Sequence, residues 1–283
     1  MKTETVPPEA GVAVRAVCGD GTDFQLISDR RGSAVWKAAG PRGTVAVKVG
    51  TGPEGAVITA REATVLHAMG RGRLLAHGRG ETAAWMVTPW YDGPSTWEAL
   101  LDVRAGRGDF ESARRYVVGV CGAVAELHAA GWVHGDLQPG HAIHTAEGVA
   151  LIDCSWAWHP AHLGPSHLFR GGMPHLLAPE TAAAVEAGEW PVTTSRPAEV
   201  YTVAASLWWA ITGAWPLAYD AIGLDPARLT AAVLRRVIGA RRIPLCDVRV
   251  WPGAQGVLGE VLTAPADSRP TAAELAALLR NAA

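Results

Sequence analysis

Short apolar runs separated by turn-forming residues dominate the chain between residues 23 and 50. The runs read FQLI, SAVWKA and TVAVKV, and the segments between them contain Gly, Pro, Ser and Asp. Apolar runs of this length bounded by such residues predict β-strands. Two further strands are predicted, one near Leu74 and one at 84–88.

Apolar residues recur at helical spacing in two later stretches. Residues 56–69 form one predicted helix, and residues 112–130 form a stronger one with Val117, Cys121 and Val124 along one side. Ser95, followed by Glu98, matches the signature of a helix N-terminus.

Two short strands are predicted at 142–144 and 149–152, around an Ala-Glu-Gly turn. After Pro179 the sequence reads as helices joined by Pro- and Gly-containing loops. The order of elements predicts an α+β protein with a small β-rich part, one helix within it, and a large helical part.

The predicted boundaries are an N-terminal extension at 1–22, a β-rich lobe at 23–93 and a helical lobe at 94–283. The first segment is polar and contains prolines, so we expect it to be loose and not a signal peptide.

Composition adds constraints on location and partners. The net charge of −2 gives no general attraction to nucleic acid or to an anionic membrane. The longest apolar run, near 203–211, is too short to span a bilayer. The four cysteines form no CxxC pair, as is usual in a reducing compartment. We therefore expect a cytoplasmic protein that binds neither nucleic acid nor membrane.

The chain also carries a series of motifs in a fixed order. They are VAVK ending at Lys48, REATVL with Glu62, WVHGDLQPGH with Asp136, LIDCS with Asp153, GMPHLLAPE ending at Glu180, EVYTVAASLWWAITGAWP, and DSRPTAAEL with Arg269. In this order they resemble the eukaryotic-like (Hanks-type) protein kinases of bacteria, over about residues 23–280. The resemblance implies a bilobal kinase-like fold that binds ATP with Mg²⁺ or Mn²⁺.

The charged residues suit phosphoryl transfer, which depends on positioning and charge neutralisation. By resemblance, Lys48 holds the α- and β-phosphates and Glu62 fixes Lys48 by an ion pair. Asp136 lies in a loop after an apolar stretch, where it can accept the proton of an attacking hydroxyl. Asp153 ends the apolar run VALI and is the expected metal ligand, with His141 beside it.

The resemblance also implies an adenine pocket. Val35 and Ala46 form its ceiling, and Thr88 stands at the gatekeeper position. Pro89 still offers a backbone carbonyl, and Tyr91 offers a backbone N–H.

The phosphate-binding loop departs from the family pattern. The stretch SDRRGS, which ends at Ser33, replaces GxGxxG and keeps a single glycine, Gly32. Arg30, Arg31 or Ser33 can compensate by contacting phosphate, or the stretch is a solvated basic turn. The sequence leaves both open.

The catalytic and metal-binding motifs depart as well. Gly135 removes the arginine that reads a phosphorylated activation loop, and Gln138 replaces a lysine that steadies the transferred group. His141 replaces the metal-binding Asn, although Mg²⁺ prefers oxygen ligands. Ser155 replaces the glycine of the metal-binding motif, and Met173 replaces a threonine.

Three further residues are expected to have structural roles. Glu180 and Arg269 resemble a buried ion pair, and Glu199 is expected to accept hydrogen bonds from the catalytic-loop backbone.

Residues 156–175 are rich in Trp and His, which favours an aromatic substrate-docking segment over a zinc site at His159 and His162.

Three functions remain open on these residues. The first is an ATP-dependent phosphotransferase acting on Ser or Thr hydroxyls of a peptide or protein. The second is a pseudokinase that serves as a binding or scaffold module, and the third is a small-molecule kinase, which also uses an HGD motif. Within the first, divergent bacterial kinase-like proteins of lanthipeptide biosynthesis suggest a precursor peptide with a leader as substrate and a separate lyase as partner.

Overall fold

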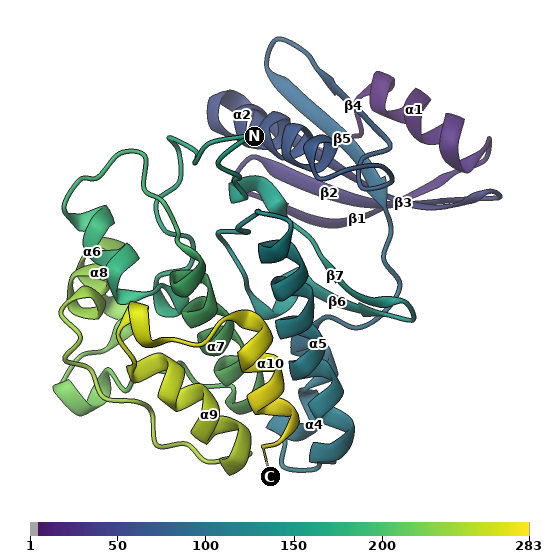
Figure 1. The fold of residues 1–283 in the computed structure, drawn as a ribbon. Coiled ribbons are helices and arrows are strands. Elements are labelled where there is room, and N and C mark those ends of the chain that lie inside the picture. Colours follow the sequence, from purple (N-terminus) through teal and green to yellow (C-terminus); the bar gives the residue numbers. More distant parts are fainter. Residues whose placement is uncertain (1–4, 283) are drawn as a thin grey trace. The chain divides into compact units, whose positions relative to one another are not determined.

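The apolar runs of the N-terminal part form one antiparallel sheet in the computed structural model, which describes residues 5–282 (Figure 1). Its strand order is β1-β2-β3-β5-β4. The strands are β1 (Asp23–Arg30), β2 (Ser33–Gly40), β3 (Gly43–Thr51), β4 (Ala76–Arg79) and β5 (Ala83–Pro89). The predicted strands are confirmed, and the one expected near Leu74 begins at Ala76.

Helix α2 (Gly52–Ala68) packs against β3 and β5. It starts directly after the last residue of β3, earlier than the predicted residue 56. Gly52 has a φ of 72°, which allows the chain to turn from strand into helix without steric strain. The α2 face toward the sheet buries Glu62 together with small and apolar residues.

The main difference from expectation is helix α1 (Pro8–Cys18). Its residues were expected to be loose, but Ala10, Val14 and Cys18 are fully buried. They form a core cluster with residues of β2, β3 and β5, including Trp36 and Val47. Packing against the sheet stabilises α1, since an isolated helix of this length is marginal in water.

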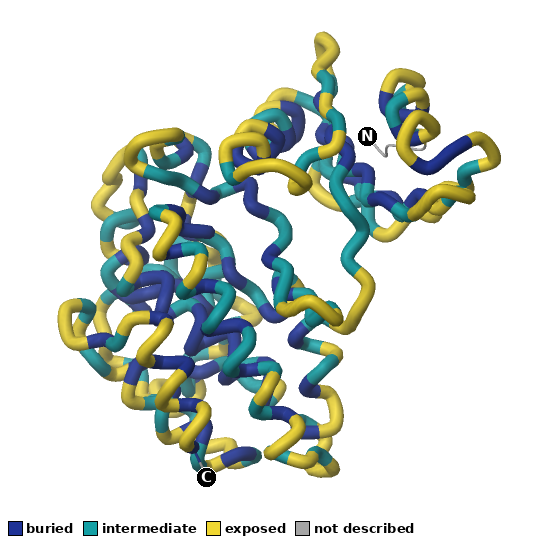
Figure 2. The backbone as a smooth tube through the Cα atoms, turned by 45° about the vertical axis from the view of Figure 1, so that its right-hand side comes forward, coloured by how far each residue is buried: buried dark blue, intermediate teal, exposed yellow. Residues whose placement is uncertain are grey.

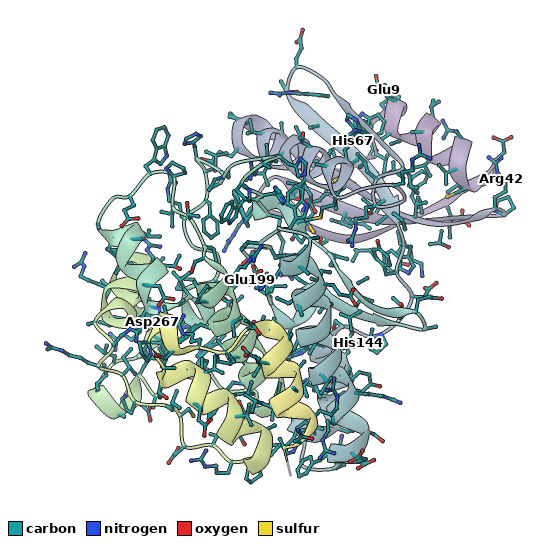
Figure 3. The ribbon with its side chains drawn as sticks, viewed as in Figure 1. Glu9, Arg42, His67, His144, Glu199 and Asp267 are labelled. Atoms are coloured by element: carbon teal, nitrogen blue, oxygen red, sulfur yellow. The ribbon has the colours of Figure 1, made fainter. Side chains whose placement is uncertain are left out.

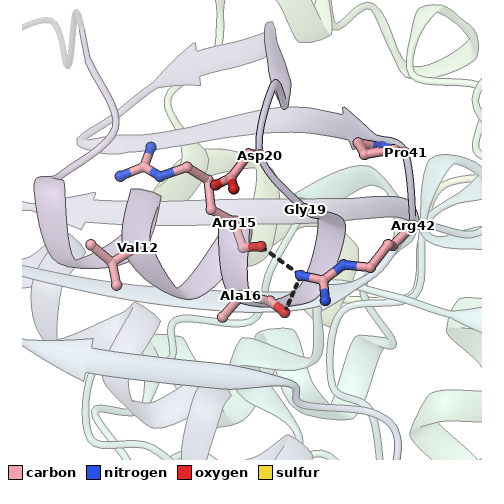
Figure 4. A pocket seen from close by; sticks show the side chains of 7 residues that line it. All are labelled: Val12, Arg15, Ala16, Gly19, Asp20, Pro41 and Arg42. Carbon is pink, nitrogen blue, oxygen red and sulfur yellow. Dashed lines mark hydrogen bonds between the residues drawn. The ribbon is translucent and has the colours of Figure 1, made fainter.

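Arg42, in the turn between β2 and β3, fixes the C-terminal end of α1. Its guanidinium donates to the carbonyl oxygens of Arg15 at 2.9 Å and Ala16 at 2.7 Å (Figure 4). Its backbone N–H donates to the carbonyl of Cys18 at 2.9 Å. These bonds satisfy carbonyls that the end of a helix leaves without partners.

Truncating Val14 is expected to destabilise the N-terminal unit measurably. Val14→Ala removes buried methyl groups and should cost about 2 kcal/mol in the free energy of unfolding. The matched control is Val12→Ala, because Val12 lies on the same helix but is 62% exposed. Urea unfolding measures both, and equal effects of the two variants would contradict the packing of α1.

The chain divides into two compact units, Met1–Tyr91 and Asp92–Ala283. The second unit is mainly helical and contains one small hairpin (Figure 1). Its helices are α3 (Thr96–Ala99), α4 (Leu101–Arg104), α5 (Phe110–Ala129), α6 (Pro179–Glu186), α7 (Arg196–Thr212), α8 (Ala231–Gly239), α9 (Pro252–Thr263) and α10 (Ala272–Arg280). The hairpin strands are β6 (Ala142–Thr145) and β7 (Gly148–Leu151).

The core of the second unit is built around α7, most of whose residues are buried (Figure 2). Tyr201, Trp208 and Ile211 are each at most 1% exposed.

The expected N-terminus at Ser95 is confirmed as a capping box, in which Ser95 and Glu98 each bond the other's backbone N–H. With its N-terminal antiparallel sheet and helical C-terminal part, the chain is an α+β protein compatible with a kinase-like fold. Among residues 5–282, no helix has the length and apolar character needed to cross a membrane.

Candidate functional site

In the first unit, Lys48 on β3 forms an ion pair with Glu62 on α2. Lys48 Nζ lies 2.7 Å from Glu62 Oε2. Both side chains are largely buried, with exposed fractions of 13% and 3%. The pair expected from the sequence is therefore present, and a buried pair of this kind fixes the direction of the lysine.

Four residues predicted to bind the nucleotide lie on the same sheet face as Lys48, namely Ser33, Val35, Ala46 and Thr88. Val35 is the cross-strand partner of Lys48, and Thr88 is the partner of Ala46. Ala46 and Lys48 are two residues apart on β3, so their side chains point to the same face. Ser33, which begins β2, precedes Val35 by two residues and shares that face. Pro89 ends β5.

The segment that replaces the glycine-rich loop is a tight hairpin. β1 ends at Arg30 and β2 begins at Ser33, so Arg31 and Gly32 alone form the turn. Both have positive φ, 52° and 75°, as a two-residue turn of type I′ requires. The carbonyl of Gly32 accepts the backbone N–H of Thr51 at 2.7 Å. Gly32 therefore serves the turn itself, and the hairpin is tied to the end of β3.

In the second unit, Asp136 lies in the loop between α5 and β6. Gln138 donates its side-chain N–H to Asp136 Oδ1 at 3.1 Å. Gly172, with a φ of 68°, approaches so closely that a Cβ there would lie 2.5 Å from Asp136 Oδ1. A residue with a side chain at position 172 would displace the carboxylate. Sequence reasoning missed Gly172, and the paired glycines Gly171-Gly172 are the signal that was available.

Glu199 on α7 anchors this loop from inside the unit (Figure 3). Its carboxylate accepts the backbone N–H groups of Gly135 at 2.7 Å and His134 at 3.1 Å. It also lies 2.8 Å from Nε2 of His128, and Glu199 itself is fully buried. The expected contact with the loop backbone is confirmed. The bond to His128 on α5 was not expected.

His134 holds the same loop against the segment before Asp153. Its Nε2–H donates to the carbonyl of Ile152 at 3.0 Å, and its Nδ1 accepts the N–H of Asp136 at 3.4 Å. Burial lowers the pKa of His134 more than neighbouring Glu199 raises it. The ring is therefore neutral, in agreement with one nitrogen donating and the other accepting.

His141 and Asp153, the predicted metal ligands, lie beside each other. His141 Nε2 is 3.6 Å from Asp153 Oδ2. His141 Nδ1 lies 2.8 Å from the carbonyl oxygen of Asp136. Asp153 has left-handed backbone angles (φ 58°, ψ 54°), and its Oδ1 accepts the hydroxyl of Ser155 at 3.1 Å.

The expected ion pair of Glu180 and Arg269 is confirmed. The two Nη atoms of Arg269 lie 2.5 and 3.0 Å from the two carboxylate oxygens of Glu180. Burial raises the pKa of Glu180, but the hydrogen bonds from Arg269, a backbone hydrogen bond and the positive charges of Arg269 and Arg241 together outweigh burial. They hold the pKa of Glu180 below its usual value. Arg269 also donates to the carbonyl of Pro197, so it ties the start of α6 to α7.

Two histidines of the Trp- and His-rich segment at 156–175 contact other rings. His159 and His162 pack together with ring centroids 4.4 Å apart, and both lie near Trp132. Within residues 5–282, no group of three His, Cys, Asp or Glu side chains is suited to hold a metal ion. The described protein groups alone therefore do not build a zinc site at His159 and His162.

Two comparisons with known proteins bear on this geometry. No family model matches the chain. The chain is 27% identical over 150 residues to the probable serine/threonine-protein kinase PkwA of Thermomonospora curvata. The match covers 52% of this chain and 19% of that protein, so the chain spans about one fifth of its length. This similarity supports a kinase-like relationship.

Proposed function

We propose that this chain is an ATP-dependent phosphotransferase that phosphorylates Ser or Thr hydroxyls of a peptide or protein. The observation that carries the proposal is the buried Lys48–Glu62 ion pair, on the sheet face that also holds Val35, Ala46 and Thr88. A strand lysine paired with a helix glutamate is the arrangement that active kinases need. The proposal assigns residues 23–93 to the N-lobe and 94–283 to the C-lobe of a bilobal kinase-like fold.

Each charged residue has a role in the proposed reaction. Lys48 holds the α- and β-phosphates, and Glu62 keeps the ammonium group in place. Asp136 accepts the hydroxyl proton of the acceptor, with its carboxylate oriented by Gln138. Val35 and Ala46 cover adenine, Thr88 borders it, and the backbones of Pro89 and Tyr91 bond its edge.

The donor set near Asp153 fits a divalent cation. Asp153 offers a carboxylate oxygen and His141 offers an imidazole nitrogen, both of which are metal ligands in proteins. These two residues would hold Mg²⁺ or Mn²⁺, which neutralises charge on the phosphates when it is bound.

Nucleotide binding is the first test of the proposal. ATP with Mg²⁺ or Mn²⁺ should stabilise the protein by about 2.7 kcal/mol at a hundredfold excess over Kd, and the melting temperature should rise. Label from γ-labelled ATP should then appear on Ser- or Thr-containing peptides. Absence of both a thermal shift and label transfer would refute the proposal.

A nucleotide-binding scaffold is the second candidate. It is favoured by Gln138, which is neutral where a lysine is expected, and by the short Arg31-Gly32 hairpin in place of a glycine-rich loop. Binding of ATP without transfer to any hydroxyl would support the scaffold function.

The main proposal also has a narrower form, in which the substrate is a ribosomal precursor peptide that a separate lyase then processes. This form predicts a mass increase of one phosphate on that peptide.

A further inference from the structure

The hydrogen bond at Nδ1 of His141 fixes how this ring presents its other nitrogen. Nδ1 lies 2.8 Å from the carbonyl oxygen of Asp136. A carbonyl oxygen can only accept, so Nδ1 carries the proton. In the neutral ring, Nε2 then carries a lone pair, and it is Nε2 that lies 3.6 Å from Asp153 Oδ2. With the ring neutral, two electron-pair donors face each other, an arrangement that a cation between them stabilises.

Both donors are held in place by a second hydrogen bond. The Nδ1–H···O=C bond of His141 is the type of contact that orients metal-binding histidines. The other carboxylate oxygen of Asp153 accepts the hydroxyl of Ser155, which is only 2% exposed. His141 itself is only 17% exposed, so its ring has little room to rotate. Nε2 and Oδ2 are thus a preorganised nitrogen–oxygen pair.

We infer that this pair makes the site selective for Mn²⁺ over Mg²⁺. The inference rests on the proposed function, in which the metal accompanies ATP. Mg²⁺ prefers six oxygen ligands in octahedral geometry, whereas Mn²⁺ accepts imidazole nitrogen together with carboxylate and phosphate oxygen. The described residues bring no third His, Cys, Asp or Glu to the pair, so phosphate and water oxygens complete the coordination.

Pulsed electron paramagnetic resonance of Mn²⁺ bound to the wild-type protein tests the inference directly. Wild-type protein should show coupling of Mn²⁺ to a histidine nitrogen, and Mg²⁺ should displace Mn²⁺ only in large excess. In His141→Asn the nitrogen coupling should disappear and Mn²⁺ affinity should fall about tenfold, since an amide oxygen replaces the imidazole. The control His162→Asn changes an exposed histidine and should keep both properties.

The outcomes separate this inference from the proposed function. Three results would each overturn the inference, even if phosphoryl transfer is observed. They are bound Mn²⁺ without nitrogen coupling, equal affinities for Mn²⁺ and Mg²⁺, and absence of Mn²⁺ binding. Conversely, nitrogen coupling that His141→Asn abolishes, in a protein that does not transfer phosphate, would support the metal site and reject the proposed function. The wild-type spectrum is decisive even if the variant does not fold.

Discussion

Replacing Asp136 by asparagine is expected to lower the rate of phosphoryl transfer by about 10²- to 10⁴-fold, the usual contribution of a general base. ATP affinity should stay within about twofold, because Asp136 is proposed to act on the hydroxyl of the acceptor and not on the nucleotide. The substitution should therefore lower the turnover rate and leave ATP binding nearly unchanged.

The contacts around Asp136 allow asparagine to replace it without displacing the loop. Asparagine has nearly the size of aspartate and retains one oxygen, which can accept the bond that Gln138 donates to Oδ1. The close approach of Gly172 leaves no room for a larger side chain, so the isosteric change is the appropriate one. Loss of rate can then be attributed to the missing base and not to a displaced loop.

Label transfer from γ-labelled ATP to a peptide, with ATP affinity measured in parallel, checks this expectation. Asp102→Asn is a suitable control, since the Asp102 side chain is 71% exposed and its carboxylate pairs with Arg107, which is also exposed. If Asp136→Asn retains the wild-type rate, Asp136 is not the base. If wild-type protein binds ATP but transfers nothing, the scaffold function gains support.

Local pattern was enough to predict the elements that carry the candidate residues. The run TVAVKV predicted a strand, and its period of two places Ala46 and Lys48 on one face, as the sheet register shows. The helix predicted at 112–130 appears as α5, because apolar spacing over so many residues dominates other signals.

Long-range contacts explain what the sequence did not reveal. Ala10, Val14 and Cys18 stand at helical spacing, but the segment is short and begins with two prolines. Only the sheet face that it covers makes α1 stable, and that face is formed by residues far along the chain. Pro8 at the first helical position was a usable signal, since proline is favoured there.

The candidate site shows the same limit. The motifs predicted the partners of Lys48, Glu180 and Glu199, because the family resemblance supplied the pairings. The resemblance did not predict that Gly172 contacts Asp136, and it did not predict that the carbonyl of Asp136 orients His141. The contact of Gly172 with Asp136 joins segments far apart in the sequence, whereas the bond of His141 to Asp136 lies within one irregular loop, whose course no periodic pattern indicates.

Replacing Glu199 by alanine is expected to destabilise the second unit by about 3–5 kcal/mol, the range for breaking a buried charged interaction. The fully buried carboxylate accepts from the N–H groups of His134 and Gly135 and contacts His128. Its removal leaves these donors without a partner, at about 1–3 kcal/mol for each unsatisfied buried group. Such a loss corresponds to a fall in melting temperature of about 10 °C for a domain of this size.

Two further variants separate the hydrogen bonds from simple loss of volume. Glu199→Gln keeps the shape and one acceptor oxygen, but its amide N–H groups face backbone donors, so its destabilisation should be intermediate. Glu126→Ala is the control, because Glu126 is exposed on α5 near His128 in sequence, and it should change stability by less than about 0.5 kcal/mol. Calorimetry measures all three. If Glu199→Ala behaves like Glu126→Ala, the carboxylate does not hold the loop, and Asp136 must be positioned by other contacts, such as those with His134, Gln138 and Gly172.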